Sequence, residues 1–181
     1  MKVANIILVT LMLFSSSAYA VVMFSEVTED DGKTRLVTNG DVEIAKNCPA
    51  NVSKLIERRS EAFENQDFNR LLGIYAPYAN VNIESKFLNR PVKNTTYTIF
   101  EVIKGGKTNR QRLSQYLYLK LGGECKLVNG QLVYTGKEVE KMVLKGKDPI
   151  YSYSNLEFQF NKSKNRIIEE TTKIRTSYYK I

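Results

Sequence analysis

The chain has 181 residues, with 27 lysines and arginines against 19 aspartates and glutamates, and it contains no histidine. The missing histidine excludes Ser–His and Cys–His nucleophile systems and removes most zinc sites, because these sites are built on imidazole. The positive charge is spread along the chain, so it favours solubility and some attraction to acidic surfaces rather than nucleic-acid binding.

The first residues, Met1–Ala20, have the pattern of an export leader. Lys2 supplies the positive start, Val3–Phe14 the apolar core, and Ala18-Tyr19-Ala20 the small-residue exit. The apolar core is shorter than the roughly 20 residues that a membrane span needs, so we predict cleavage rather than an anchor. No later stretch is apolar enough to span a membrane. The protein is therefore expected in the periplasm or outside the cell.

The rest of the chain has the size of one domain. We divide it into an N-terminal extension, residues 21–50, and a single domain, residues 51–181. The extension contains a possible β-hairpin, because apolar residues alternate before Asp30-Asp31-Gly32 and resume at Leu36-Val37, and Asp-Gly is a strong turn signal. The sequence leaves open whether this extension packs on the domain or trails as an arm.

The two cysteines, Cys48 and Cys125, both follow the predicted leader. Paired thiols are oxidised in an exported protein, so we predict a disulfide between them. The chain contains neither a C-x-x-C motif nor a histidine that would complete a zinc shell, so no metal or cofactor is expected.

A helix is predicted from Asn51, with Asn51 or Ser53 as its cap, because apolar residues then recur at three- and four-residue spacing. Asp67 is the predicted cap of a second, short helix, which ends before Pro77. The apolar residues of the first helix are Val52, Leu55, Ile56, Ala62 and Phe63. A first strand follows at 81–83.

This region resembles the opening of the nuclear-transport-factor-two-like superfamily. In that superfamily a long helix ends at an aspartate that starts a second helix, and a Tyr-Ala-Pro-type step leads into the first strand. The resemblance implies an α+β fold in which a curved antiparallel sheet packs around two to three N-terminal helices to form a cone with an apolar cavity. The matching segments are Leu55-Ile56, Ala62-Phe63-Glu64-Asn65-Gln66-Asp67, Leu71-Leu72, Tyr75-Ala76-Pro77 and Ala79-Asn80-Val81.

Two segments in the middle of the chain are ambiguous. Thr95–Ile103 is rich in β-formers, although Thr98 and Glu101 also fit the capping box of a short helix. For 109–121 we predict a helix, because leucines recur at four-residue spacing before Gly122-Gly123. A strand with alternating tyrosines and leucines is the alternative.

The C-terminal part is predicted to be all β. Asn129-Gly130 lies between two apolar runs and indicates a tight hairpin. Strands are expected at 139–144, 151–160 and 166–179, and the last two form a hairpin whose apolar and polar residues alternate. Such alternation is typical of an antiparallel sheet that is covered on one face.

Enzymes of this superfamily often hold acids and tyrosines inside the cone, so a carboxylate on the apolar face of a predicted strand would indicate a catalytic base. Asp67 is explained as a helix cap and Glu157 lies on the polar side of its strand, so no buried base was identified. Lysines 137, 141 and 145 share one strand face, which we interpret as solvated. Weak candidates for lining a ligand pocket are the tyrosines Tyr75, Tyr97, Tyr116, Tyr134 and Tyr153.

The sequence alone therefore favours an exported, non-catalytic binding or scaffold domain. Its expected partner is a small apolar ligand or an envelope protein, and an oligomer is possible. One alternative is an isomerase-, dehydratase- or cyclase-like enzyme that uses a carboxylate and a tyrosine in the cone, since this chemistry needs no histidine. Another alternative is a subunit of an envelope assembly.

Overall fold

The computed structural model of the protein describes residues 24–38, 40, 42–87 and 90–177. The predicted leader lies outside these residues. Among them, no helix is long and apolar enough to cross a membrane. The elements are β1 (Phe24–Thr28), β2 (Thr34–Thr38), α1 (Ala50–Glu64), the 3-10 helix η1 (Phe68–Gly73), β3 (Tyr75–Phe87), β4 (Lys93–Thr98), α2 (Ile99–Arg110), β5 (Leu113–Val128), β6 (Gln131–Leu144), β7 (Pro149–Phe160) and β8 (Ile167–Ser177).

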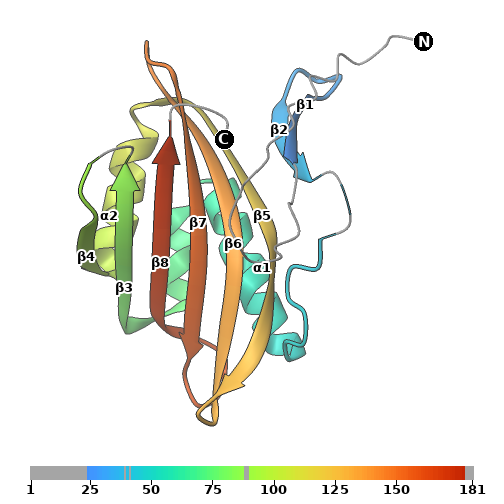
Figure 1. Ribbon diagram of the computed structural model, residues 1–181, viewed down its shortest axis with the longest axis vertical. Coiled ribbons are helices and arrows are strands. Elements are labelled where there is room, and N and C mark those ends of the chain that lie inside the picture. Colours follow the sequence, from blue (N-terminus) through green and yellow to red (C-terminus); the bar gives the residue numbers. More distant parts are fainter. Residues whose placement is uncertain (1–23, 39, 41, 88–89, 178–181) are drawn as a thin grey trace.

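Six strands form one curved sheet in the order β4-β3-β8-β7-β6-β5. Figure 1 shows α1 and α2 on one face of this sheet, which we call the inner face. The α+β class, with a sheet packed around three helical elements, is confirmed. The sheet is mixed rather than purely antiparallel, because the last strand, β8, returns beside the first, β3, and runs parallel to it.

Helix α1 forms where the apolar spacing predicted it, but its start differs from the prediction. Neither Asn51 nor Ser53 caps it. Pro49 is the N-cap residue, and its carbonyl oxygen accepts from the amides of Val52 and Ser53 at 2.9 Å each. Asp67 does precede η1, yet its side chain makes no capping hydrogen bond. The buried side of α1 packs on inner-face residues of β6 and β7 and builds the main core.

The first ambiguous segment, Thr95–Ile103, contains both of the elements considered for it. β4 ends at Thr98, and Thr98 and Glu101 form a complete capping box that starts α2. The segment predicted as a helix, 109–121, instead contains the start of β5. Gly122-Gly123 does not end a helix but lies within this strand, beside a register shift. A side chain at Gly123 would collide with the hydroxyl of Tyr134, so the close approach requires glycine.

Both predicted C-terminal hairpins are confirmed. Asn129 and Gly130 take positive φ values of 50° and 78° between β5 and β6, as a tight two-residue turn requires. β7 pairs antiparallel with β8 along almost its whole length. Part of the last predicted strand, residues 178 and 179, lies outside the described residues.

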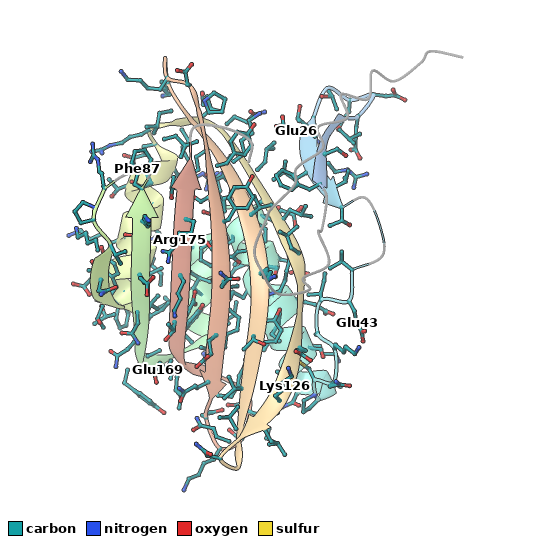
Figure 2. The ribbon with its side chains drawn as sticks, in the orientation of Figure 1. Glu26, Glu43, Phe87, Lys126, Glu169 and Arg175 are labelled. Atoms are coloured by element: carbon teal, nitrogen blue, oxygen red, sulfur yellow. A yellow bond between two sulfur atoms is a disulfide. The ribbon has the colours of Figure 1, made fainter. Side chains whose placement is uncertain are left out.

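The N-terminal hairpin β1–β2 is confirmed, and it packs on the face of the sheet that points away from the helices, the outer face. Phe24 and Leu36 bury themselves against Leu117 and Val139. Glu26 of β1, labelled in Figure 2, accepts hydrogen bonds from the Lys141 ammonium at 2.7 Å and the Tyr151 hydroxyl at 3.0 Å. The extension is therefore part of the packed structure. Lys141, predicted as a solvated position, is buried by this contact.

The predicted disulfide between Cys48 and Cys125 is present, with a Cα–Cα distance of 4.9 Å. It joins the segment before α1 to β5. Backbone hydrogen bonds reinforce the same junction, because the Lys46 amide donates to Gly123 and the Cys125 amide donates to Lys46, at 2.9 Å each. The bond thus closes a loop over a sequence separation of 77.

Replacing both cysteines, Cys48→Ala with Cys125→Ala, is expected to lower the free energy of unfolding by about 2–4 kcal/mol, because the unfolded chain regains the freedom that a long closed loop removes. Chemical denaturation monitored by circular dichroism measures the change. A double variant as stable as the unreduced parent would contradict the expectation.

Candidate active site

The inner face of the sheet contains a buried charged cluster centred on Arg59 of α1. Its guanidinium donates from Nη1 to Oε2 of Glu138 at 3.0 Å and from Nη2 to Oε1 of Glu170 at 2.8 Å. Arg59 is 1% exposed and each glutamate is 4% exposed. Tyr75 accepts from Arg59 Nε at 2.8 Å and donates a short hydrogen bond to Glu170.

The surrounding groups keep Arg59 and Glu170 ionised. Burial raises the pKa of a carboxyl group, but Arg59 and the hydroxyls of Tyr75 and Thr172 outweigh burial and lower the pKa of Glu170. Burial also opposes the charge of Arg59, yet Glu170, Tyr75 and Glu138 raise the pKa of Arg59 well above its usual value. The guanidinium lies over the rings of Phe63 and Phe158, 4.4 and 4.9 Å from their centres. Arg59, Tyr75, Glu138 and Glu170 are bonded within the cluster, so their positions are fixed. We call these four residues the charged floor.

A third carboxylate, Glu140, lies on β6 two residues beyond Glu138 and on the same face. It is partly buried and accepts a hydrogen bond from the Tyr116 hydroxyl at 2.6 Å. Burial, and then the negative charge of Glu138, raise the pKa of Glu140 to about 7. Burial and the neighbouring Glu140 raise the pKa of Tyr116 well above its usual value, so its hydroxyl keeps its proton. Glu140 thus exchanges a proton near neutral pH beside a permanent donor.

A pocket of about 180 Å³ reaches Tyr116 from the surface. Glu140 therefore lies one hydrogen bond behind the pocket wall. The pocket is polar and carries one positive charge, that of Arg110, whose Nη1 donates to the Gln66 carbonyl at 3.3 Å. Its lining residues are Gln66, Arg110, Leu113, Ser114, Gln115 and Tyr116.

This arrangement separates two kinds of carboxylate. Glu170 is held as an anion by Arg59, whereas Glu140 is poised to gain and lose a proton. Pairs of acids whose pKa values are pushed apart are typical of acid–base sites, and a catalytic group works best when its pKa is near the working pH. Glu140 with Tyr116 can therefore perform proton transfer without histidine, metal or cofactor.

The structure places the five candidate tyrosines in different environments. Tyr75 belongs to the charged cluster and Tyr116 to the pocket. Tyr134 is fully buried on the inner face, stacked on Phe158, and donates to the Ile44 carbonyl at 3.0 Å. Tyr97 lies on the edge strand β4, opposite Val81. Tyr153 was misplaced by the prediction, because it lies on the outer face against Phe24 and cannot line the cone.

The prediction that no carboxylate is buried is also wrong, and the signals that would have found the cluster are simple. Glu138 and Glu140 alternate with Lys137, Val139 and Lys141, so a strand that turns these lysines outward turns both acids inward. Glu170 lies two residues after Ile168 in the predicted strand 166–179, so it shares the strand face of this apolar residue.

Arg59 gives a comparable signal in the helix. It follows Leu55 by four residues and Ile56 by three, which places it on the apolar side of the helix. A charged residue on the apolar face of a helix, together with two acids on the apolar face of strands, predicts a buried ion pair.

Comparison with known proteins shows which solved structures share the fold of this chain. No protein-family model matches the sequence, and no curated protein matches it. Among solved structures, AusH from Aspergillus nidulans is similar with a TM-score of 0.52 at 11% identity, over 71% of this chain and 86% of that one.

Two further structures are similar to the same degree. Kfla4162 from Kribbella flavida has a TM-score of 0.52 at 10% identity, over 69% of this chain and 88% of that one. IdmH from Streptomyces antibioticus, named as a candidate polyketide cyclase, has a TM-score of 0.51 at 14% identity, over 68% and 91%. At these identities the likeness establishes the fold alone, and the cone-like α+β fold that the resemblance implied is confirmed.

The preference for a non-catalytic binding or scaffold domain is corrected by two findings. Its main ground was a missing carboxylate, yet three carboxylates face the cone and each is bonded to a tyrosine hydroxyl: Glu170 to Tyr75, Glu138 to Tyr118 and Glu140 to Tyr116. In addition, IdmH is named as a candidate enzyme of this fold. The enzyme alternative accounts better for both.

Replacing Arg59 with methionine is expected to lower the free energy of unfolding by about 3–5 kcal/mol, because Glu138 and Glu170 are then left buried without a counter-charge. Without Arg59, the charge that lowers the pKa of Glu170 is lost and burial raises that pKa instead, so the folded state takes up a proton and the loss is smaller at pH 5 than at pH 8. Urea denaturation at both pH values measures this. The exposed neighbour provides the control: Arg58→Met should change stability by less than about 0.5 kcal/mol, and equal losses in the two variants would refute the assignment.

Proposed function

We propose that the protein is an enzyme that moves a proton on a small carbonyl compound, in the manner of isomerases, dehydratases and cyclases. The observation that carries this proposal is the Glu140–Tyr116 pair behind the pocket: a carboxylate with a pKa of about 7, bonded at 2.6 Å to a hydroxyl that stays protonated.

In this mechanism the anionic form of Glu140 removes a proton from the carbon next to the carbonyl group. Negative charge then develops on the carbonyl oxygen, and the Tyr116 hydroxyl, released from Glu140, donates a hydrogen bond to it. A donor already aimed at the site stabilises such an oxyanion more than water does. The protonated Glu140 returns the proton at another atom, which completes an isomerisation or prepares the loss of a leaving group.

The charged floor affects the pKa of Glu140 through the charge of Glu138. Glu138 is held in place by Arg59 at 3.0 Å and by the Tyr118 hydroxyl at 2.7 Å, so its negative charge is fixed near Glu140. This fixed charge contributes to the raised pKa of Glu140. The floor therefore tunes the acid–base group without taking part in proton transfer.

The activity can be tested by deuterium exchange in D₂O, followed by proton NMR, with cyclohexanone, 2-pentanone and acetophenone as carbonyl probes. The exchange rate is expected to rise with pH through about 7, because the anionic form of Glu140 is the base. Glu140→Gln should lower the rate about 10²–10⁴-fold, and Tyr116→Phe about tenfold or more.

The matched control is Glu157→Gln, because Glu157 lies exposed on the outer face. It should leave the exchange rate unchanged. A Glu140→Gln variant that exchanges as fast as the parent, or a rate without a step near neutral pH, would refute the assignment of Glu140.

We also propose that the protein works outside the cytosol, in the periplasm or secreted. The leader pattern at Met1–Ala20 and the disulfide between Cys48 and Cys125 support this, since structural disulfides persist in oxidising compartments.

Expression of the full chain in a bacterium is expected to yield a processed protein that starts at Val21, found in the envelope or medium, with no free thiol. Intact mass and thiol titration measure both properties. The control lacks residues 2–20 and should stay in the cytosol with reduced cysteines. An unprocessed, cytosolic full-length chain would contradict the proposal.

A further inference from the structure

Lys120 is a buried amine that the proposed proton transfer does not use. It lies on the inner face of β5, directly opposite Glu138 of β6, and is 5% exposed. Its Nζ has no hydrogen-bond partner among the residues that the structure describes. An ammonium group carries three donors, so a buried lysine without any acceptor is unusual.

The groups around Lys120 explain this isolation. Nζ lies over the aromatic faces of Tyr134 and Phe158, 4.8 and 5.8 Å from their ring centres. The carboxylates on β6 and β8 are engaged elsewhere, since Glu138 and Glu170 accept hydrogen bonds from Arg59 and from hydroxyl groups.

The protonation of Lys120 follows from the same surroundings. Burial and the positive charge of Arg59 lower the pKa of Lys120 to about 7, against the opposing effect of Glu138 and Glu170. A substantial share of the amine is therefore neutral near pH 7, with its lone pair free. An ordinary lysine at this pH is only about 0.04% neutral.

We propose that Lys120 is a nucleophilic amine that forms an imine with a small aldehyde or ketone inside the cone. A lone pair that is neither protonated nor hydrogen-bonded is what attack on a carbonyl carbon needs. The rings of Tyr134 and Phe158 then face the nitrogen of the product and favour its cationic, protonated form.

The step balances without an oxidant or a reductant. The Nζ lone pair forms a bond to the carbonyl carbon, and the carbonyl π electrons move to oxygen, which takes up a proton to give a carbinolamine. The attacking nitrogen gives up one proton to solvent as the carbinolamine forms. The hydroxyl group then takes up a proton and leaves as water, the nitrogen lone pair forms the carbon–nitrogen double bond, and release of the last nitrogen proton gives the neutral imine.

Lys120 lies on the same strand face as the pocket residue Tyr116. Tyr116, Tyr118 and Lys120 are successive inner-face residues of β5, so Lys120 lies two inner-face positions further along the strand. The proposal does not require Glu140 to act as a base, so each of the two assignments can fail alone.

The test uses the full mature protein, acetaldehyde at pH 7 and sodium cyanoborohydride, which reduces an imine to a stable ethyl-amine. Peptide mapping by mass spectrometry then compares labelling at Lys120 with labelling at the exposed Lys54 and Lys173. Lys120 is expected to be labelled at least tenfold faster than either, as its larger neutral fraction allows. Labelling of the exposed lysines with none at Lys120 would overturn the proposal.

Two variants and a pH series separate the possible causes. Lys120→Met should fold, since Nζ leaves no partner behind, and should lose the fast label while near-ultraviolet circular dichroism stays unchanged. Glu140→Gln should keep the label even though it stops proton exchange. Across pH 5–10 the labelling of Lys120 should rise with a midpoint near 7, and a midpoint near that of the exposed lysines would refute a free amine.

Discussion

The ion pair of one arginine with two glutamates is the constraint on which the inner face depends. Arg59 comes from the helix, and Glu138 and Glu170 come from two non-adjacent strands. All three are buried, so water cannot replace the hydrogen bonds that they make to one another. If the helix moved away from the sheet, a charged group would be left unpaired in an apolar environment. This costs far more free energy than breaking an exposed ion pair. The cluster therefore fixes how α1 sits on the sheet.

The same ion pair divides the remaining ionisable groups by role. Because the guanidinium pairs with Glu138 and Glu170, the next carboxylate along β6, Glu140, is bonded to the Tyr116 hydroxyl instead, and Lys120, opposite Glu138, has no hydrogen-bond partner among the described residues. Burial, and then the negative charge of Glu138, raise the pKa of Glu140, whereas burial, and then the positive charge of Arg59, lower the pKa of Lys120, so both groups are shifted toward their neutral forms. Groups whose titration is displaced in this way gather at functional sites more often than elsewhere.

The parts of the fold that the sequence predicted well are those set by local chemistry. The Asn129-Gly130 turn, the β7–β8 alternation, the cysteine pair and the apolar stripe of α1 each follow from residues close together or from chemistry with few alternatives. The segment 109–121 was misjudged because leucines four residues apart also share one face of a strand, so the pattern fits both periods. The choice between them came from pairing with β6, which is not visible locally.

The candidate site was harder to predict, because a single polar residue on the core face of a strand looks like an exception to the alternation of apolar and polar residues. Glu138, Glu140 and Glu170 acquire a meaning only once the partner residue Arg59 is known to face them across the core. Tyr153 shows the opposite case, since its spacing suited a pocket and only the sheet register placed it on the other side. Register, rather than composition, decided both outcomes.

The N-terminal hairpin has a consequence for how the molecule meets its neighbours. Phe24 and Leu36 cover apolar residues of the outer sheet surface. The first two strands of the chain therefore bury an apolar patch that would otherwise be exposed and prone to association. A second copy of the protein can bind that surface only if the hairpin is displaced, which breaks the hydrogen bonds of Glu26 with Lys141 and Tyr151. The hairpin thus acts as an intramolecular competitor that discourages face-to-face stacking of sheets.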